Sequence, residues 1–101
     1  MNTQFKKGVL EMCVLALLVK REFYGYELVQ EISKKIAISE GTIYPLLNRL
    51  KHDKFVSTYL QESTDGPPRK YYKLSELGKK KLADFKQDWS GFVDIINKFL
   101  K

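Results

Sequence analysis

The sequence of 101 residues predicts an α+β fold that is mainly α-helical. Four stretches have the composition of helices, and in three of them apolar residues recur at three- and four-residue steps. Before the last of these stretches, two segments rich in β-branched and aromatic residues flank a turn-rich gap, which is the pattern of a β-hairpin. We therefore expect three helices and a two-stranded hairpin in residues 1–74, and a further helix in residues 75–101, within one compact unit.

The first predicted helix, from about Lys6 to Lys20, is apolar around its whole circumference. Such a helix is buried on all sides. In a chain of this size one side can pack on its own domain, so we expect a second subunit to cover the other. Cys13 lies in this helix, where the role of a small core residue is favoured over a redox or nucleophilic role. A single cysteine excludes an internal disulfide and fits a reducing cytoplasm.

The apolar run Met12–Val19 imitates the core of a secretory signal, because Lys6 and Lys7 precede it. However, Glu11 interrupts the pattern, and charged residues at 20–22 replace the small residues of a cleavage site. The run is also shorter than the roughly 20 residues that span a bilayer. We therefore expect neither a signal peptide nor insertion into a membrane.

Charge favours a polyanionic partner, because the formal net charge is +6. Nucleic acid and an anionic membrane surface both fit this charge. One cysteine and one histidine cannot form a Cys/His metal site, and no glycine loop for phosphates or paired-carboxylate motif occurs. His52 has no serine or cysteine nucleophile placed with it, so a solvated or phosphate-touching role is favoured. We expect no enzyme activity, no metal and no cofactor.

A helix-turn-helix is predicted between Tyr24 and His52. The second helix opens at residues 24–26, Ile36-Ala37-Ile38 forms a compact connector, and Ser39 offers a hydroxyl N-cap to the third helix. Two short helices joined by a short turn are typical of this motif. The apolar side of the third helix, Ile43, Leu46, Leu47 and Leu50, is expected to face the core.

The opposite side of the third helix suits a nucleic-acid groove. It combines a glycine for close backbone approach, an amide that can pair bidentately with adenine, and cationic flanks. We assign base readout to Thr42, Tyr44 and Asn48, and phosphate contacts to cationic residues. Pro45 lies beyond the first turn of this helix, where its ring removes a hydrogen bond and crowds the carbonyl of Gly41, which argues against a regular helix at this point. The candidate DNA-binding residues of this helix are Ser39, Gly41, Thr42, Tyr44, Pro45, Asn48, Arg49 and Lys51.

The hairpin is predicted from strands at Phe55–Leu60 and Lys70–Leu74. Between them, Glu62–Pro68 is expected to be unable to extend the ladder, because proline lacks the N–H and glycine favours turns. This segment is therefore a projecting wing. Arg69 and Lys70 on its return side are placed to meet phosphates or a minor groove, although a solvated hairpin tip is the alternative.

The last helix is expected to begin after Ser75, whose hydroxyl can act as its N-cap. Its apolar residues are spaced three and four apart, as in the seam of a coiled coil. The three preceding helices are too small to bury so long a seam, so we expect it to pack on its symmetry mate or on the partner's first helix in a two-fold dimer; packing within one chain is the alternative. The predicted dimerisation residues are Leu82, Phe85, Trp89, Phe92, Ile96 and Phe99.

Trp89, the only tryptophan, lies in the middle of this seam. It is either an anchor of the interface or a planar platform for an apolar aromatic ligand between subunits.

Three stretches carry a family resemblance: Gly8–Glu11 leading through the apolar helix to Tyr24–Leu28, then Glu40–Leu50, then Gly66–Leu74 running into Ser75–Gly78. Together they resemble the PadR family of bacterial transcriptional regulators, of the short type with a single C-terminal dimerisation helix. Beyond Gly78 the last helix matches only in character.

The resemblance implies a winged helix-turn-helix repressor that binds operator DNA as a homodimer and responds to a small molecule or another signal. It makes Ser39–His52 the recognition helix and Glu62–Lys70 the wing. Tyr44-Pro45 is a usual part of the recognition helix in this family, which implies a local bend or a loosened first turn on its DNA side. In similar family members a tryptophan of the C-terminal helix lines an apolar opening at the dimer interface for flat aromatic compounds, and Trp89 matches that placement. The family often has a glycine after the recognition helix, where this chain has Asp53-Lys54, so a different shape of the helix end is expected.

A second function class is a winged-helix module that binds protein and not DNA, because a fold does not determine its partner. The positive net charge and the Arg69-Lys70 wing argue against it.

Overall fold

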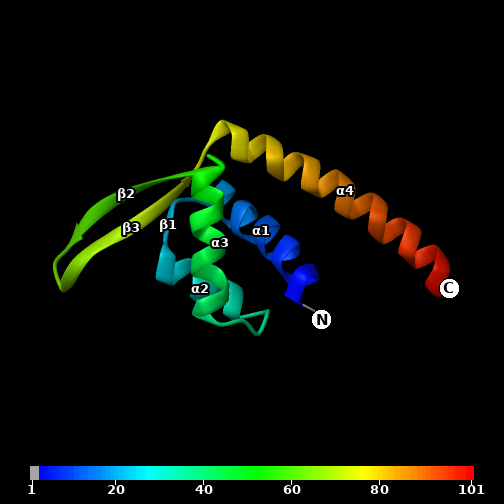
Figure 1. The fold of residues 1–101 in the computed structure, drawn as a ribbon, viewed down its shortest axis with the longest axis horizontal. Helices are drawn as coiled ribbons and strands as arrows, with labels where there is room; N and C mark the ends of the chain where they lie inside the picture. The colour runs from blue at the N-terminus through cyan, green and yellow to red at the C-terminus, as the bar shows by residue number, and fades with distance from the viewer. Residues whose placement is uncertain (1–2) are drawn as a thin grey trace.

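The computed structural model describes the backbone of residues 3–101 and the side chains from Lys7 onward. It confirms the winged helix-turn-helix and the mainly helical α+β class (Figure 1). The elements in order are α1 (Thr3–Lys20), β1 (Phe23–Tyr24), α2 (Gly25–Ser33), α3 (Glu40–His52), β2 (Val56–Ser63), β3 (Gly66–Leu74) and α4 (Glu76–Leu100).

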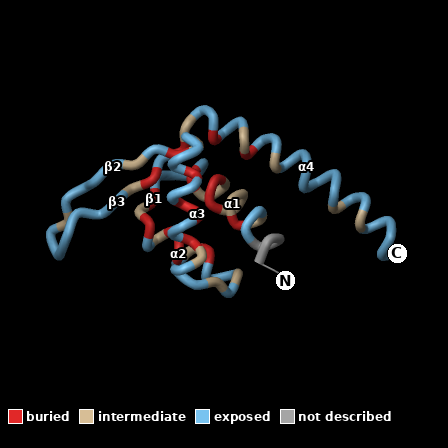
Figure 2. The backbone as a smooth tube through the Cα atoms, in the orientation of Figure 1, coloured by how far each residue is buried: buried red, intermediate tan, exposed pale blue. Residues whose placement is uncertain are grey.

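The hydrophobic core lies where α1, α2, α3 and the base of the sheet meet, as the buried segments of Figure 2 show. The apolar side of α3 enters this core as predicted, with Ile43 and Leu47 fully buried. From α1, Leu10, Val14 and Leu15 complete the centre. By contrast, α4 is exposed along most of its length and projects beyond the core, so the longest dimension of the chain is 54 Å.

The sheet has three antiparallel strands in the order β1-β3-β2. The prediction that the second helix opens at Tyr24 was wrong, because α2 begins at Gly25, and Phe23 and Tyr24 pair with Tyr72 and Tyr71 of β3. The buried Phe23 ring explains this strand, since it covers the core beside β3.

The wing strands are longer than predicted. The prediction that Glu62–Pro68 cannot extend the ladder was wrong, because β2 runs to Ser63 and β3 starts at Gly66. The register is irregular between Gln61 and Ser63, and the two prolines have no register partner. An irregular register accommodates residues that cannot donate a ladder hydrogen bond.

Helix α3 is one continuous helix, with Pro45 on its exposed side. Ser39 stands at its N-cap, where its carbonyl accepts from the N–H of Thr42 at 3.1 Å. The predicted hydroxyl cap was wrong: the Ser39 hydroxyl lies 3.3 Å from the Thr42 hydroxyl, and makes no hydrogen bond to the helix backbone.

Helix α3 ends with a residue in the left-handed conformation, a position at which glycine is usual but which Lys54 occupies here. Lys54 adopts φ 65°, in the left-handed region. The N–H of Phe55 donates to the Leu50 carbonyl at 3.0 Å, and the N–H of Lys54 donates to the Lys51 carbonyl at 3.0 Å, which together form a Schellman motif. A lysine therefore occupies the left-handed position at which glycine is the usual residue.

Lys54→Gly is expected to raise the free energy of unfolding by about 1 kcal/mol, because glycine adopts the left-handed conformation without the steric cost of a side chain. Urea unfolding followed by circular dichroism measures this change. Asp53→Gly is the matched control, since Asp53 has φ −81° and offers no such gain. A Lys54→Gly variant no more stable than Asp53→Gly would contradict the assignment.

A junction of hydrogen bonds joins the end of α3 to the start of α4. The N–H of Ser75 donates to the Phe55 carbonyl at 3.1 Å, and its hydroxyl lies 2.7 Å from the Lys54 carbonyl oxygen. The same hydroxyl accepts from the N–H of Gly78 at 2.9 Å, which confirms Ser75 as the N-cap of α4. Gly78 is buried directly against Phe55. We call this set of contacts the α3–α4 junction.

Candidate nucleic-acid interface

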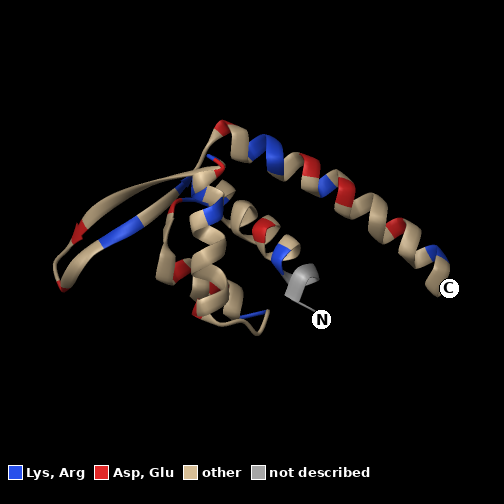
Figure 3. Ribbon diagram, in the orientation of Figure 1, with Lys and Arg blue, Asp and Glu red and all other residues tan. Residues whose placement is uncertain are grey.

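The exposed side of α3 carries the residues that the sequence assigns to DNA. Tyr44, Pro45, Asn48 and Lys51 are all exposed, while the four apolar residues on the other side are buried. Figure 3 shows basic residues near the C-terminal end of α3 and a basic segment on β3 of the wing. The helix therefore presents one polar face with cations at its margin.

A hollow of about 300 Å³ lies between the start of α2, helix α3 and strand β3. It brings Tyr44 and Asn48 of the helix together with Lys70 of the wing. Tyr44 was a predicted site residue, but Tyr24, Tyr26 and Tyr72 were not. The signal for Tyr24 and Tyr26 in the sequence is the run of aromatic residues around Gly25 at the start of α2. The lining residues are Tyr24, Gly25, Tyr26, Tyr44, Asn48, Lys70 and Tyr72.

Tyr44 is held in this hollow by close contact with the backbone of Gly25. A Cβ atom added at Gly25 would lie 3.0 Å from Cε1 of the Tyr44 ring. Burial, and then the negative charge of Glu40, raise the pKa of the Tyr44 hydroxyl above its usual value. The phenol therefore stays protonated at neutral pH and keeps its capacity to donate a hydrogen bond.

The two basic residues of the wing point in opposite directions, because successive residues of a strand alternate between its faces. Lys70 borders the hollow beside α3. The Arg69 guanidinium instead lies 4.7 Å from the centre of the Tyr24 ring. The structure thus brings Lys70, but not Arg69, to the helix face that carries Tyr44 and Asn48.

A row of three tyrosines crosses the sheet at the base of the wing. Tyr71 of β3 stacks on Tyr59 of β2 with ring centres 5.5 Å apart, and its ring centre is 5.6 Å from that of Tyr24 in β1. The Tyr59 hydroxyl donates to Glu22, and this hydrogen bond raises the pKa of Tyr59. The row links all three strands and supports the base of the wing.

Arg49 lies on the flank of α3 and forms an ion pair with Glu11 of α1. Its side chain is 49% exposed, so the ion pair leaves part of it open to solvent. At the start of the helix, Ser39 and Gly41 are exposed and Thr42 is half-buried. The assigned DNA contacts of these residues stay predictions.

Helix α4 packs against the core only near its start and becomes more exposed toward its C-terminal end. Leu82 is buried and Phe85 is half-buried against the core, but Phe92 is 51% exposed and Phe99 is 81% exposed. Trp89 borders two apolar grooves between α1 and α4, of about 290 and 280 Å³. Ile95 and Leu100, outside the predicted seam, are also exposed.

Within the described residues, no three His, Cys, Asp or Glu side chains are grouped to hold a metal ion. None of the helices in residues 3–101 has both the length and the apolar content needed to cross a membrane. His52 is exposed, with Nδ1 3.3 Å from Oδ1 of Asp53.

The comparisons with known proteins agree with one another, because the family model and three similar proteins all represent transcriptional regulators. The Transcriptional regulator PadR-like family matches residues 14–84. A solved structure of a PadR-like transcriptional regulator from Bacillus cereus is 40% identical, covers 98% of both chains and superposes with a TM-score of 0.86. A Streptococcus transcriptional regulator is 38% identical, covers 99% of this chain and all of its own, and superposes with a TM-score of 0.88. The transcriptional regulator Rv3488 of Mycobacterium tuberculosis is 29% identical over 80% of this chain and 76% of its own.

Proposed function

This chain belongs to the PadR-like family of DNA-binding transcriptional regulators, which are not enzymes, and from that premise we propose that it is a cytoplasmic repressor that binds operator DNA as a homodimer. The observation that supports operator binding is the hollow where Tyr44 and Asn48 of α3 lie beside Lys70 of the wing. Residues 1–74 then form the DNA-binding part and residues 75–101 the dimerisation helix.

In the proposed complex each α3 enters a major groove, and the two half-sites lie about 34–36 Å apart along the duplex. Thr42, Tyr44 and Asn48 read base edges, because they lie on or beside the exposed side of the helix. Lys51 and Lys70 contact phosphates, which position the protein without reading sequence. Arg49 and Arg69 add phosphate contacts from the edges of this surface. Ser39, Gly41 and Pro45 allow close approach at the start of the helix.

Asn48→Ala and Lys70→Ala are expected to weaken DNA binding in different ways. Loss of a bidentate amide–base pair should lower the preference for operator over random duplex by about 2 kcal/mol, which is about thirtyfold. Loss of the Lys70 charge should weaken both duplexes alike and reduce the salt dependence by about one phosphate contact. Fluorescence anisotropy over a salt series, with an operator selected from a random duplex pool, measures both effects.

Lys80→Ala is the matched control for charge, since Lys80 is exposed on α4 and does not line the hollow between α3 and the wing. Equal loss of specific and random binding in Asn48→Ala would remove Asn48 from base readout. Absence of duplex binding by the unsubstituted protein, even at low ionic strength, would instead favour a protein-binding winged-helix module.

We also propose that the homodimer forms through α4 and that a flat aromatic ligand acts at Trp89. The exposed apolar residues of the outer half of α4 support the dimer, because patches of this kind on small soluble proteins mark interaction surfaces. The two grooves beside Trp89 support the ligand, since both are lined mostly by apolar side chains. Of the predicted seam, Leu82 is buried in the core of its own chain, so the proposed interface consists of Phe85, Trp89, Phe92, Ile96 and Phe99.

A further inference from the structure

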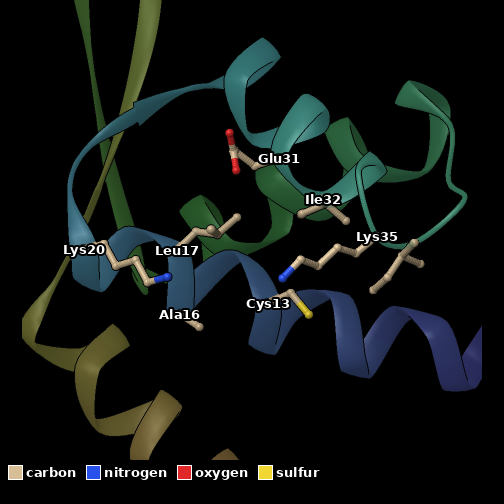
Figure 4. A pocket seen from close by; sticks show the side chains of 8 residues that line it. Cys13, Ala16, Leu17, Lys20, Glu31, Ile32 and Lys35 are labelled. Atoms are coloured by element: carbon tan, nitrogen blue, oxygen red, sulfur yellow. The ribbon is translucent and has the colours of Figure 1, made fainter.

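A third groove adjoins the α1–α4 groove, with which it shares Cys13 and Ala16, and it has no role in the proposed function. It lies between α1 and α2 and has a volume of about 220 Å³. Its floor is apolar, formed mainly by Leu17 and Ala16 of α1, by Ile32 near the end of α2 and by Ile36 in the turn that follows α2. Figure 4 shows the groove with Cys13 at one side.

Two cations stand over this apolar floor. Figure 4 shows the side chains of Lys20, at the end of α1, and Lys35, in the turn after α2, pointing toward one another across the groove. Among the described residues, neither lysine forms an ion pair. The groove therefore combines an apolar surface with two ammonium groups that form no ion pair within the described part of the chain.

Glu31 is the one acidic residue that lines the groove, and its charge is already engaged. Its carboxylate accepts from the Lys34 ammonium at 2.8 Å, and Lys34 lies outside the groove. This hydrogen bond, and then the charges of Lys34, Arg21 and Lys20, lower the pKa of Glu31, so the carboxylate stays ionised and paired at neutral pH. The Glu31–Lys34 pair is neutral in sum, which leaves the groove with the positive charge of Lys20 and Lys35.

From this arrangement we propose that the α1–α2 groove binds a small organic carboxylate with an apolar body, held by Lys20 and Lys35. An apolar cavity of about 150 Å³ accepts benzene, so 220 Å³ has room for a body of roughly eight to ten heavy atoms. The apolar body lies on Leu17, Ile32 and Ile36, and the carboxylate lies between the two ammonium groups. This site is distinct from the Trp89 grooves, which lie between α1 and α4.

Octanoate and 1-octanol are suitable probes, because they share an apolar chain and differ in charge. Isothermal titration calorimetry on the protein without DNA measures binding of each, so the result does not depend on the proposed function. Octanoate is expected to bind the unsubstituted protein more tightly than octanol. Lys20→Ala and Lys35→Ala should each weaken octanoate about three- to fivefold, and leave octanol within about twofold.

Lys86→Ala is the matched control, because Lys86 lines the α1–α4 groove that also contains Cys13. It should leave octanoate binding unchanged. Octanoate should also slow alkylation of Cys13 by iodoacetamide, measured by mass spectrometry at mildly alkaline pH, because burial raises the pKa of this thiol. Lys20→Ala together with Lys35→Ala should remove most of this protection.

The proposal is overturned if octanoate fails to bind, if octanol binds as tightly, or if the double lysine variant binds octanoate as well as the unsubstituted protein. It is also overturned if Lys86→Ala weakens octanoate while the lysines of the α1–α2 groove have no effect. A failure to bind any DNA duplex would contradict the proposed function and leave this site untouched.

Discussion

Gly78→Ala is expected to lower the free energy of unfolding by about 3 kcal/mol, a large part of the stability of a small domain. A Cβ atom at Gly78 would lie 2.1 Å from the Phe55 carbonyl oxygen and 2.6 Å from Cδ1 of Leu74. The first contact involves backbone that is fixed by the α3–α4 junction, so it cannot be relieved by rotating a side chain. Either α4 moves away from the end of α3, or the junction loses its hydrogen bonds.

Gly91→Ala is the matched control in the same helix. An added Cβ at Gly91 meets nothing within 4 Å. Alanine is the better helix former there, so this variant should be more stable by up to about 1 kcal/mol. Urea midpoints of the two variants should therefore move in opposite directions. A Gly78→Ala variant as stable as the original chain would show that the close contact with Phe55 is not rigid.

Phe92→Glu is expected to produce a monomer that binds operator DNA at least a hundredfold more weakly. Phe92 is 51% exposed in the single chain, at the middle of the proposed dimer seam, and a buried carboxylate there would have no partner. A monomer loses the linkage between two half-sites, which is typically worth a factor of about 10² to 10⁴. Sedimentation velocity gives the oligomeric state, and anisotropy gives the DNA affinity.

Gln87→Glu adds the same charge on an exposed position of α4 outside the seam, so it should remain dimeric. Flat aromatic compounds should change Trp89 fluorescence in this control and lose much of that effect in Phe92→Glu, because the proposed ligand site is completed by the partner. A Phe92→Glu protein that stays dimeric would place the interface elsewhere. Failure of every compound to alter the fluorescence would leave Trp89 as an interface anchor.

Much of the fold was predictable because periodicity reports burial directly. The steps of three and four in α3 identified its buried side, and Ser75 marked the start of α4. Strand β1 was missed because two residues are too few for a pattern, and its partners lie in β3, far along the chain. The length of the wing was missed because prolines were expected to end the ladder of hydrogen bonds. In the structure the strands pair on both sides of Pro67 and Pro68, and the two prolines themselves have no partner.

The candidate site was predictable in its residue types and less so in its geometry. Strand alternation already implied that Arg69 and Lys70 face opposite ways, but only the structure shows Arg69 over Tyr24 and Lys70 beside Asn48. The pairing of Arg49 with Glu11 joins residues of α3 and α1, and no local pattern reports such a contact. The left-handed backbone at Lys54 was also hidden, because its side chain gives no sign of that conformation.

Because the α3–α4 junction joins the end of α3 to the start of a long helix, a small rotation at the junction becomes a large displacement at the far end of α4. Helix α4 has 25 residues and is therefore about 37 Å long, and its N-cap Ser75 is hydrogen-bonded to Lys54 and Phe55 just after the end of α3. A rotation of about 5° at the junction displaces the far end of α4 by roughly 3 Å. In a dimer joined through α4, the same rotation would instead shift the two α3 helices relative to each other. A small change of angle between the two α4 helices would then be enough to change the distance between the two α3 helices, so that they no longer fit successive major grooves.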